Sequence, residues 1–251
     1  MELKKVISEL EKFDGRYKRE KVTFAIEHQK EITPHLISIL KEVTKNPIKF
    51  IQDKNYFGHI YALMLLGYFK EEKAHKVLIE LFCLPDSIID GLFGDIAAAE
   101  FTGALYQSCG GSVDEIKKLA LNKNVPDLTR NSACDALLYA VVDRIITREE
   151  ALRFLSTLFT GEETTSPSDF WGLVACDICD LCPDKNSYEV IKQAYFDNLI
   201  HDGIVAFEEF QEAIDLGVEA SLNNIRQDKQ ARLLDDIHEM MSWWACFEGY
   251  N

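Results

Sequence analysis

The sequence predicts an all-α protein, an α-α superhelix of the HEAT or armadillo-like solenoid kind with about five to six helix pairs. The first observation is an internal repeat. Phe57-Gly58-x-Ile60-x-Ala62 recurs as Phe93-Gly94-x-Ile96-x-Ala98, and Trp171-Gly172 opens a third copy. The second observation is that no segment of useful length alternates apolar and polar residues with the period of a strand.

A third observation is a shared helix start. Ser112-x-x-Glu115, Thr147-x-x-Glu150 and Asn186-x-x-Glu189 each resemble a capping box, in which a side-chain oxygen accepts a hydrogen bond from a free backbone N–H at the helix start. Their spacing is typical of stacked helix pairs.

The apolar periodicity, with Pro and Gly as breaks, places the helices along the chain. We expect them at residues 1–13, 18–29, 33–46, 56–69, 73–84, 93–111, 112–121, 126–143, 147–159, 169–181, 186–199, 206–216, 218–226 and 232–247. Residues 93–111 form the expected central helix, apolar nearly all round and closed by Gly110 and Gly111.

We interpret residues 1–251 as a single solenoid domain. Residues 1–50 are the expected N-terminal cap helices, 51–200 the regular helix pairs and 201–251 irregular C-terminal cap helices. No stretch is long and apolar enough to predict a membrane span, and the N-terminal residues do not resemble a secretory signal. The 7 cysteines predict free thiols in a reducing cytoplasm.

The net charge of −15 argues against nucleic acid as a partner, because phosphate contacts need a basic surface. Residues 1–50 carry 11 Lys/Arg and 8 Asp/Glu, so the acidic excess lies beyond them. Residues 77–116, 154–184 and 193–225 contain no Lys or Arg. They are either solvated helix faces or one acidic surface that attracts a basic partner. On the second interpretation Asp86, Asp90 and Asp95 are candidate partner-binding residues.

Trp243 and Trp244, within Ser242 to Phe247, are the other candidate partner-binding residues. An aromatic segment of this kind either covers the last repeat or docks another chain.

Two motifs resemble metal sites. Cys176-x-x-Cys179-x-x-Cys182 has the spacing of thiolate ligands, but Asn186 stands where an iron–sulfur run needs a fourth Cys, so we interpret the three cysteines as structural. Residues 198–209 imitate half of an EF-hand loop, yet Ile200 and Ala206 occupy ligand positions, which favours a simple turn at Asp202-Gly203. We therefore expect no metal and no cofactor.

Several phrases together resemble one family. They are Leu84-Pro85 leading to Gly94-Asp95, Cys109-Gly110-Gly111, Leu199 to Phe210 around Gly203, and Ser242 to Phe247. The chain resembles, from about residue 10 to residue 247, the bacterial family known as domain of unknown function 1186. The resemblance implies a helical-repeat fold and supplies no catalytic residue.

No nucleophile motif, phosphate loop or dinucleotide fingerprint is present. The sequence therefore favours a non-enzymatic, cytoplasmic scaffold or adaptor that binds another protein through an acidic surface. The alternative is an enzyme or small-ligand-binding protein with a carboxylate-lined site in the solenoid groove.

Overall fold

The computed structural model describes residues 2–162, 168–201, 203–233 and 236–247. The described residues form helices and loops without a strand, apart from one isolated bridge between Lys12 and Tyr56. The predicted all-α class is confirmed. None of the described helices is long and apolar enough to cross a membrane.

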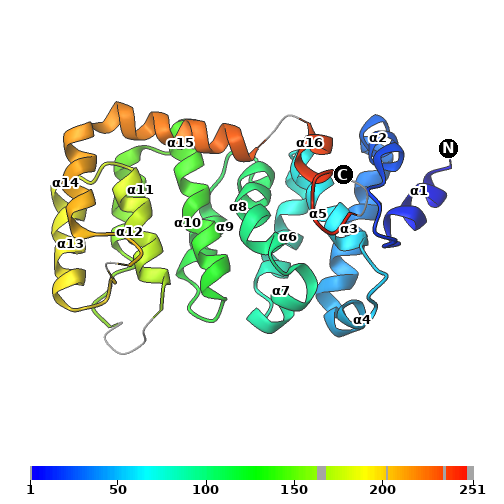
Figure 1. Cartoon of the computed structure of the whole chain (residues 1–251), viewed down its shortest axis with the longest axis horizontal. Coiled ribbons are helices and arrows are strands. Elements are labelled where there is room, and N and C mark those ends of the chain that lie inside the picture. Colours follow the sequence, from blue (N-terminus) through cyan, green and yellow to red (C-terminus); the bar gives the residue numbers. More distant parts are fainter. Residues whose placement is uncertain (1, 163–167, 202, 234–235, 248–251) are drawn as a thin grey trace. The chain divides into compact units, whose positions relative to one another are not determined.

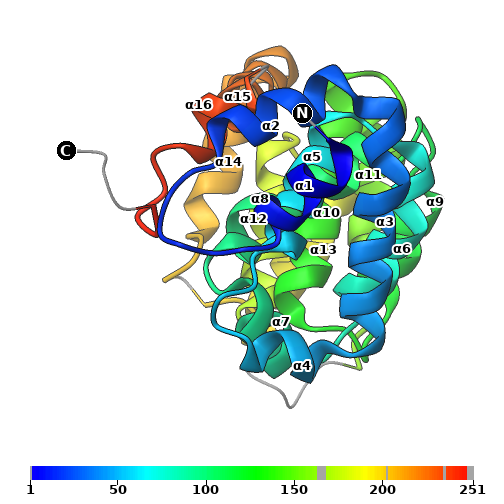
Figure 2. The same ribbon diagram turned by 90° about the vertical axis from the view of Figure 1, so that its right-hand side faces the viewer.

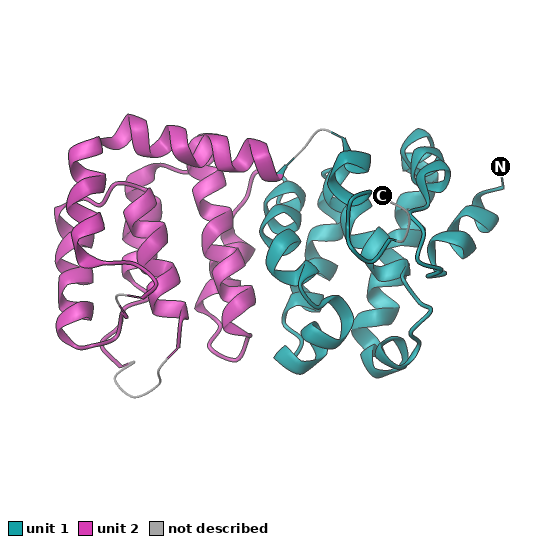
Figure 3. Ribbon diagram, viewed as in Figure 1, with its two compact units in different colours: residues 1–110, 233–251 teal, residues 111–232 magenta. Residues whose placement is uncertain are grey.

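The chain divides into two compact units (Figure 3). Unit 1 comprises residues 1–110 and 233–251, and unit 2 comprises residues 111–232.

Unit 1 is built around a helix that is buried on all sides. Its elements are α1 (Leu3–Leu10), α2 (Arg19–Glu27), α3 (Gln29–Lys45), α4 (Pro47–Gln52), α5 (Gly58–Tyr68), the 3₁₀ turn η1 (Glu72–Ala74), α6 (His75–Phe82), α7 (Asp86–Phe93), α8 (Ile96–Ser108) and α16 (Ile237–Met241). Every residue of α5 from Gly58 to Gly67 is buried, because α5 packs against both α3 and α8 (Figure 2). Phe82 and Phe101 stack beside it at 3.7 Å between ring centroids.

The predicted central helix is wrong at its start. Phe93 ends α7, Gly94 breaks the chain with φ +51°, and α8 begins only at Ile96. Two short helices, α4 and α7, were not predicted because Pro47 and Pro85 were interpreted as stops. A proline fits the first turn of a helix, and Pro47 begins α4, while Pro85 immediately precedes α7.

Unit 2 contains seven helices among its described residues. They are α9 (Asp114–Leu121), α10 (Asp127–Val142), α11 (Arg148–Ser156), α12 (Phe170–Asp180), α13 (Lys185–Phe196), α14 (Phe207–Leu216) and α15 (Val218–Arg232). α10 is the inner helix and contacts α9, α11, α12 and α15. α15 runs across α10 and α12 rather than alongside them (Figure 1).

Contacts between neighbouring helices recur at one sequence separation. His59 Nε2 lies 2.6 Å from the Leu92 carbonyl oxygen, and Arg148 Nε donates to the Leu181 carbonyl oxygen at 2.6 Å, each across 33 residues. The contacts of His75 with Ser108 and of Lys117 with Glu150 span the same 33 residues. This separation differs from the 36 residues that lie between Phe57 and Phe93 in the predicted repeat.

One of the three predicted helix caps is confirmed. Thr147 accepts a hydrogen bond from the Glu150 backbone N–H at 3.1 Å. The other two predictions are wrong in position: Val113 precedes α9, and Asp184, rather than Asn186, caps α13 by accepting from the Ser187 N–H at 2.8 Å.

Candidate functional site

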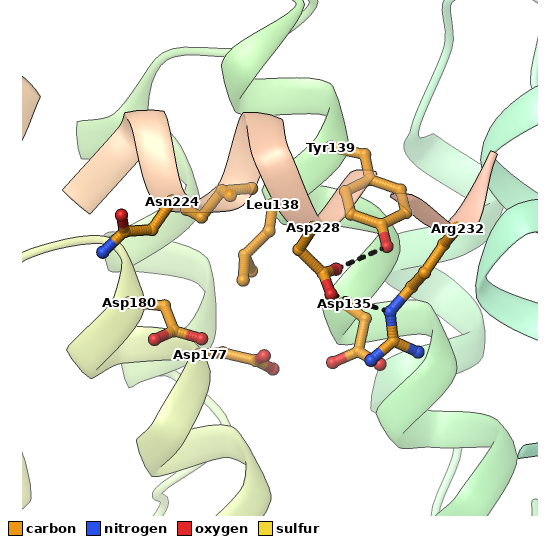
Figure 4. A pocket seen from close by; sticks show the side chains of 9 residues that line it. Asp135, Leu138, Tyr139, Asp177, Asp180, Asn224, Asp228 and Arg232 are labelled. Atoms are coloured by element: carbon orange, nitrogen blue, oxygen red, sulfur yellow. Dashed lines mark hydrogen bonds and ion pairs between the residues drawn. The ribbon is translucent and has the colours of Figure 1, made fainter. Parts of the chain in front are cut away.

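The candidate site is an acidic cavity of about 290 Å³ in unit 2, where α15 crosses α10 and α12 (Figure 4). Asp135, Leu138, Tyr139, Asp177, Asp180, Asn224, Ile225, Asp228 and Arg232 line it. We call this the acidic cavity. Four of its nine lining residues are aspartates, and its one cationic lining residue is Arg232.

Helical spacing explains how each helix supplies two or more of these side chains. Asp177 and Asp180 lie three residues apart on α12, so both lie on one face. Asp135 and Tyr139 lie four residues apart on α10, and Asp228 and Arg232 have the same spacing on α15. Ile225 is buried and anchors α15 over the cavity.

Asp177 forms the floor of the cavity, and its side chain is almost completely buried. The residue is 4 % exposed. Burial raises its pKa well above the ordinary value, and the negative charge of Asp135 and a hydrogen bond with it raise the pKa further. The two carboxyl groups face each other (Figure 4). Oδ2 of Asp177 is buried, and no hydrogen-bond partner for it exists among the described residues.

Asp180 lies at the mouth of the cavity, where it is accessible to solvent. Burial of its carboxyl group by the surrounding protein, followed by the charges of Asp135, Asp228 and Glu209, raises its pKa to about 6. No ion pair of Asp180 is found in the described part of the chain. Asp180 therefore titrates close to neutral pH.

The α15 side of the cavity is held by a connected set of polar contacts. The hydroxyl of Tyr139 donates to Asp228 Oδ2 at 2.9 Å, and Arg232 Nε donates to Asp228 Oδ1 at 2.9 Å. Lys229, the neighbour of Asp228 on α15, forms an ion pair with Asp143, which lies one helical turn after Tyr139 at the end of α10. Asp228 thus accepts hydrogen bonds from two side chains.

The resulting chemistry is that of a cation receptor. The carboxyl groups of Asp177 and Asp180 line the cavity beside Asp135, and burial raises the pKa of both. A cationic group that enters would favour their ionised forms. No group of three His, Cys, Asp or Glu side chains in the described residues has the geometry to hold a metal ion.

The predicted acidic residues Asp86, Asp90 and Asp95 lie elsewhere. All three are exposed in unit 1, the first two on α7 and the third just before α8. Their spacing of four residues puts Asp86 and Asp90 on one face of α7. They remain a predicted partner surface, and the acidic cavity does not include them.

The aromatic C-terminal segment is divided between two roles. Phe247 is buried against Tyr17, Phe57 and Tyr61, and Trp244 stacks on Phe247 at 6.1 Å between ring centroids. Trp243 is 67 % exposed. The segment thus covers part of unit 1 and not the last repeat, which one interpretation had predicted, while Trp243 remains a candidate for binding a partner.

The three cysteines at positions 176, 179 and 182 are buried within unit 2 to different degrees. Cys182 is buried, whereas Cys176 and Cys179 are only half-buried, so the predicted burial holds fully for Cys182 alone. Burial of the thiols, with the charge of Asp177 next for Cys176 and that of Asp180 next for Cys179, raises both pKa values to about 12. These thiols are therefore poor nucleophiles at neutral pH.

The segment that resembles half of an EF-hand loop contributes a cap to the start of α14. Asp202 lies outside the described residues, but Glu209 Oε1 accepts a hydrogen bond from the Ala206 backbone N–H at 2.8 Å and so caps α14. Its carboxylate thus has a structural role.

Sequence reasoning missed every aspartate of the acidic cavity as a site residue. A signal was present: Asp135 and Asp177 each interrupt an otherwise apolar stretch, SACDALLYAVV and GLVACDIC. A carboxyl group inside a buried helix is unusual enough to mark a candidate site.

The comparisons with known proteins identify a family. A family model described as "Protein of unknown function (DUF1186)" matches residues 1–248, so the chain belongs to this family. An uncharacterized protein of Chlamydia muridarum is 28% identical over 97% of this chain and 97% of its own length. An uncharacterized protein of Chlamydia trachomatis serovar D is 27% identical over 98% of each chain. No solved structure matches.

Proposed function

We propose that the protein is a non-enzymatic scaffold or adaptor whose unit 2 binds a basic segment of another protein. A cationic side chain of that partner enters the acidic cavity. The observation that carries the proposal is Asp177, a buried carboxyl group with one oxygen for which the described residues offer no hydrogen-bond partner, beside the carboxyl group of Asp180 at the mouth of the cavity. Burying such a group is unfavourable unless a ligand compensates for it.

The helical repeat supports the same function. Contacts at a separation of 33 residues recur in each unit, which favours the HEAT or armadillo-like solenoid that the sequence predicts. Proteins of that kind bind partners over extended surfaces. The net charge of −15 would attract a basic partner and speed its association. A cytoplasmic location is part of this proposal.

The test uses short labelled peptides that contain both arginine and lysine, with binding followed by fluorescence anisotropy. We expect binding that weakens as salt rises, and that the double variant Asp177→Asn and Asp180→Asn weakens by about tenfold or more. The matched control is Glu189→Gln, which removes one negative charge from the exposed face of α13 outside the cavity.

Two results would refute the proposal. The first is no binding of basic peptides by the wild-type protein at low salt. The second is equal weakening by the aspartate and Glu189 variants, which would make the binding a nonspecific effect of net charge.

A second candidate is an enzyme or small-ligand-binding protein that uses the same carboxyl groups. The pKa of Asp177, which burial raises, favours it, because a carboxyl group that stays protonated near neutral pH can act as a general acid. This candidate predicts turnover of a bound compound that Asp177→Asn reduces by about a hundredfold or more. Peptide binding without any turnover would favour the scaffold.

A further inference from the structure

We propose that unit 1 contains a separate binding site, a groove along α3 that takes an organic anion with a hydrocarbon body. The groove has a volume of about 600 Å³, which lies within the range of small-ligand sites in proteins. We call it the α3 groove. All its lining residues belong to unit 1, so the inference goes beyond the proposed function and does not depend on the acidic cavity.

One face of α3 supplies most of the α3 groove. Five lining side chains share that face by helical spacing: Lys30, Thr33, Pro34, Ile37 and Lys41. The start of η1 supplies Glu71 and Lys73. Gln29 Nε2 donates to the Phe69 carbonyl oxygen at 3.4 Å and so ties the first residue of α3 to the segment that leads to η1.

The observation that points to a ligand is the hydroxyl group of Thr33. This residue lines the groove and is 6 % exposed, and its Oγ1 is buried without a hydrogen-bond partner among the described residues. Thr44 on the same helix, by contrast, donates to the Leu40 carbonyl oxygen at 2.8 Å. Because a buried hydroxyl group normally has a partner, a ligand oxygen that accepts from Thr33 would complete the site.

The charge of the α3 groove favours an anion. Its charged lining residues are three lysines and Glu71, in a chain whose net charge is −15. None of the three lysines forms an ion pair in the described part of the chain. Glu71 Oε1 already accepts a hydrogen bond from the Lys73 backbone N–H at 3.2 Å, and it caps η1. The lysines therefore remain available to a negatively charged ligand.

The surface between the lysines favours a hydrocarbon body. Pro34 and Ile37 lie there, and the stems of lysine side chains are themselves apolar. Lys30 and Lys41 lie about 16 Å apart along the helix axis, which leaves room for a chain of several carbons. A small inorganic anion would leave this apolar surface in water, whereas a hydrocarbon chain would cover it.

The experiment titrates octanoate into the full chain and follows chemical-shift changes of the backbone amides. We expect the shifts to centre on residues 29–41 and 71–73. Octanol and octylammonium keep the hydrocarbon chain and change the charge, and inorganic phosphate keeps a negative charge without the chain. We expect each of these three probes to bind about tenfold more weakly than octanoate, or less tightly still.

Thr33→Val tests the hydroxyl group, since valine keeps the branched shape. We expect it to weaken octanoate binding severalfold and to leave the ligand-free protein as stable as before, because the lost hydroxyl group had no partner to lose. The matched control is Thr44→Val, which lies on the same helix outside the groove and should leave binding unchanged. Equal octanoate binding by the two variants would overturn the inference.

A second pair of variants keeps the inference testable should Thr33→Val fold poorly. Lys30→Gln removes an exposed charge of the groove, and Lys45→Gln removes an exposed charge of α3 outside it. We expect only Lys30→Gln to weaken octanoate binding, and equal effects would overturn the inference.

The wild-type titration can also refute the inference. Absence of octanoate binding, or shifts confined to other parts of the chain, would overturn it. Octanol or inorganic phosphate that binds as tightly as octanoate would overturn it too, because the charge or the hydrocarbon body would then have no role. None of these results bears on the acidic cavity, which is tested with basic peptides.

Discussion

The hydroxyl of Tyr139 fixes α15 over the acidic cavity, and Tyr139→Phe should loosen that helix. Only Ser221 and Ile225 are buried among the residues of α15, so the helix depends strongly on polar contacts with α10. Tyr139 is itself buried and donates to Asp228 Oδ2 at 2.9 Å. Removal of the hydroxyl leaves Asp228 without this donor.

The magnitude follows from the charge and exposure of the acceptor. A hydrogen bond to a charged group stabilises a protein by about 1.5–3 kcal/mol, and exposure to water reduces the value. The side chain of Asp228 is 49% exposed, so we expect a loss of about 1 kcal/mol in the free energy of unfolding. A double-mutant cycle with Asp228→Asn should assign most of this loss to the Tyr139–Asp228 contact.

The assay combines urea unfolding with hydrogen exchange of the α15 amides. We expect faster exchange along α15 in Tyr139→Phe and weaker binding of the basic peptides, since one wall of the cavity then opens more often. The control is Tyr188→Phe on α13, whose hydroxyl has no hydrogen bond in the described part of the chain. Equal effects of the two variants, or unchanged exchange along α15, would refute the role assigned to Tyr139.

Three further expectations concern pH and two repeat glycines. Binding of the basic peptides should strengthen as pH rises through about 6, because Asp180 is neutral below its raised pKa and ionised above it; titration of the affinity from about pH 5 to about pH 8 measures this. Gly172→Ala should destabilise the protein by about 1–3 kcal/mol, since a Cβ there would lie 2.7 Å from Ile204 Cδ1, and Ile204→Ala should relieve much of the loss in thermal unfolding. Gly94→Ala should cost about 1 kcal/mol through its φ of +51° and gain no relief from Ile204→Ala.

The two glycine predictions revise the sequence-based explanation of the repeat. The recurrence of Gly58, Gly94 and Gly172 suggested a common need for close packing. Packing limits Gly58 and Gly172, whose added Cβ atoms would lie 2.8 Å from the Tyr56 hydroxyl and 2.7 Å from Ile204. At Gly94 the nearest atom is 4.0 Å away, so the cause is backbone conformation instead.

The helical class could be predicted because periodicity and breaks are local properties of the sequence. The short helices α4 and α7 could not, because a proline can either end one helix or begin the next, and tertiary packing decides between them. The acidic cavity is a tertiary feature, since Asp135, Asp177 and Asp228 come from helices far apart in the chain. Part of the cavity lining could be recognised in the sequence. Asp177 and Asp180 lie in one stretch without Lys or Arg, and the neutral Asn224 lies in another.

Unit 1 shows that an inner helix of this fold has no need of a buried carboxyl group. From Gly58 to Gly67 α5 is buried throughout and contains no Asp or Glu, whereas α12 of unit 2 buries Asp177. Because the raised pKa of Asp177 means that the folded state holds its proton more tightly than the unfolded chain does, the folded protein loses stability as pH rises.

Asp177→Asn removes that dependence. We expect it to raise the free energy of unfolding at about pH 8 by roughly 1 kcal/mol or more, with a gain that shrinks in mild acid, while it weakens the binding of the basic peptides. Urea unfolding at several pH values tests the first part, and the peptide assay tests the second. A variant that is less stable at every pH would assign Asp177 to the architecture of unit 2. A variant that is more stable and no longer binds would show that this carboxyl group is kept for its ligand.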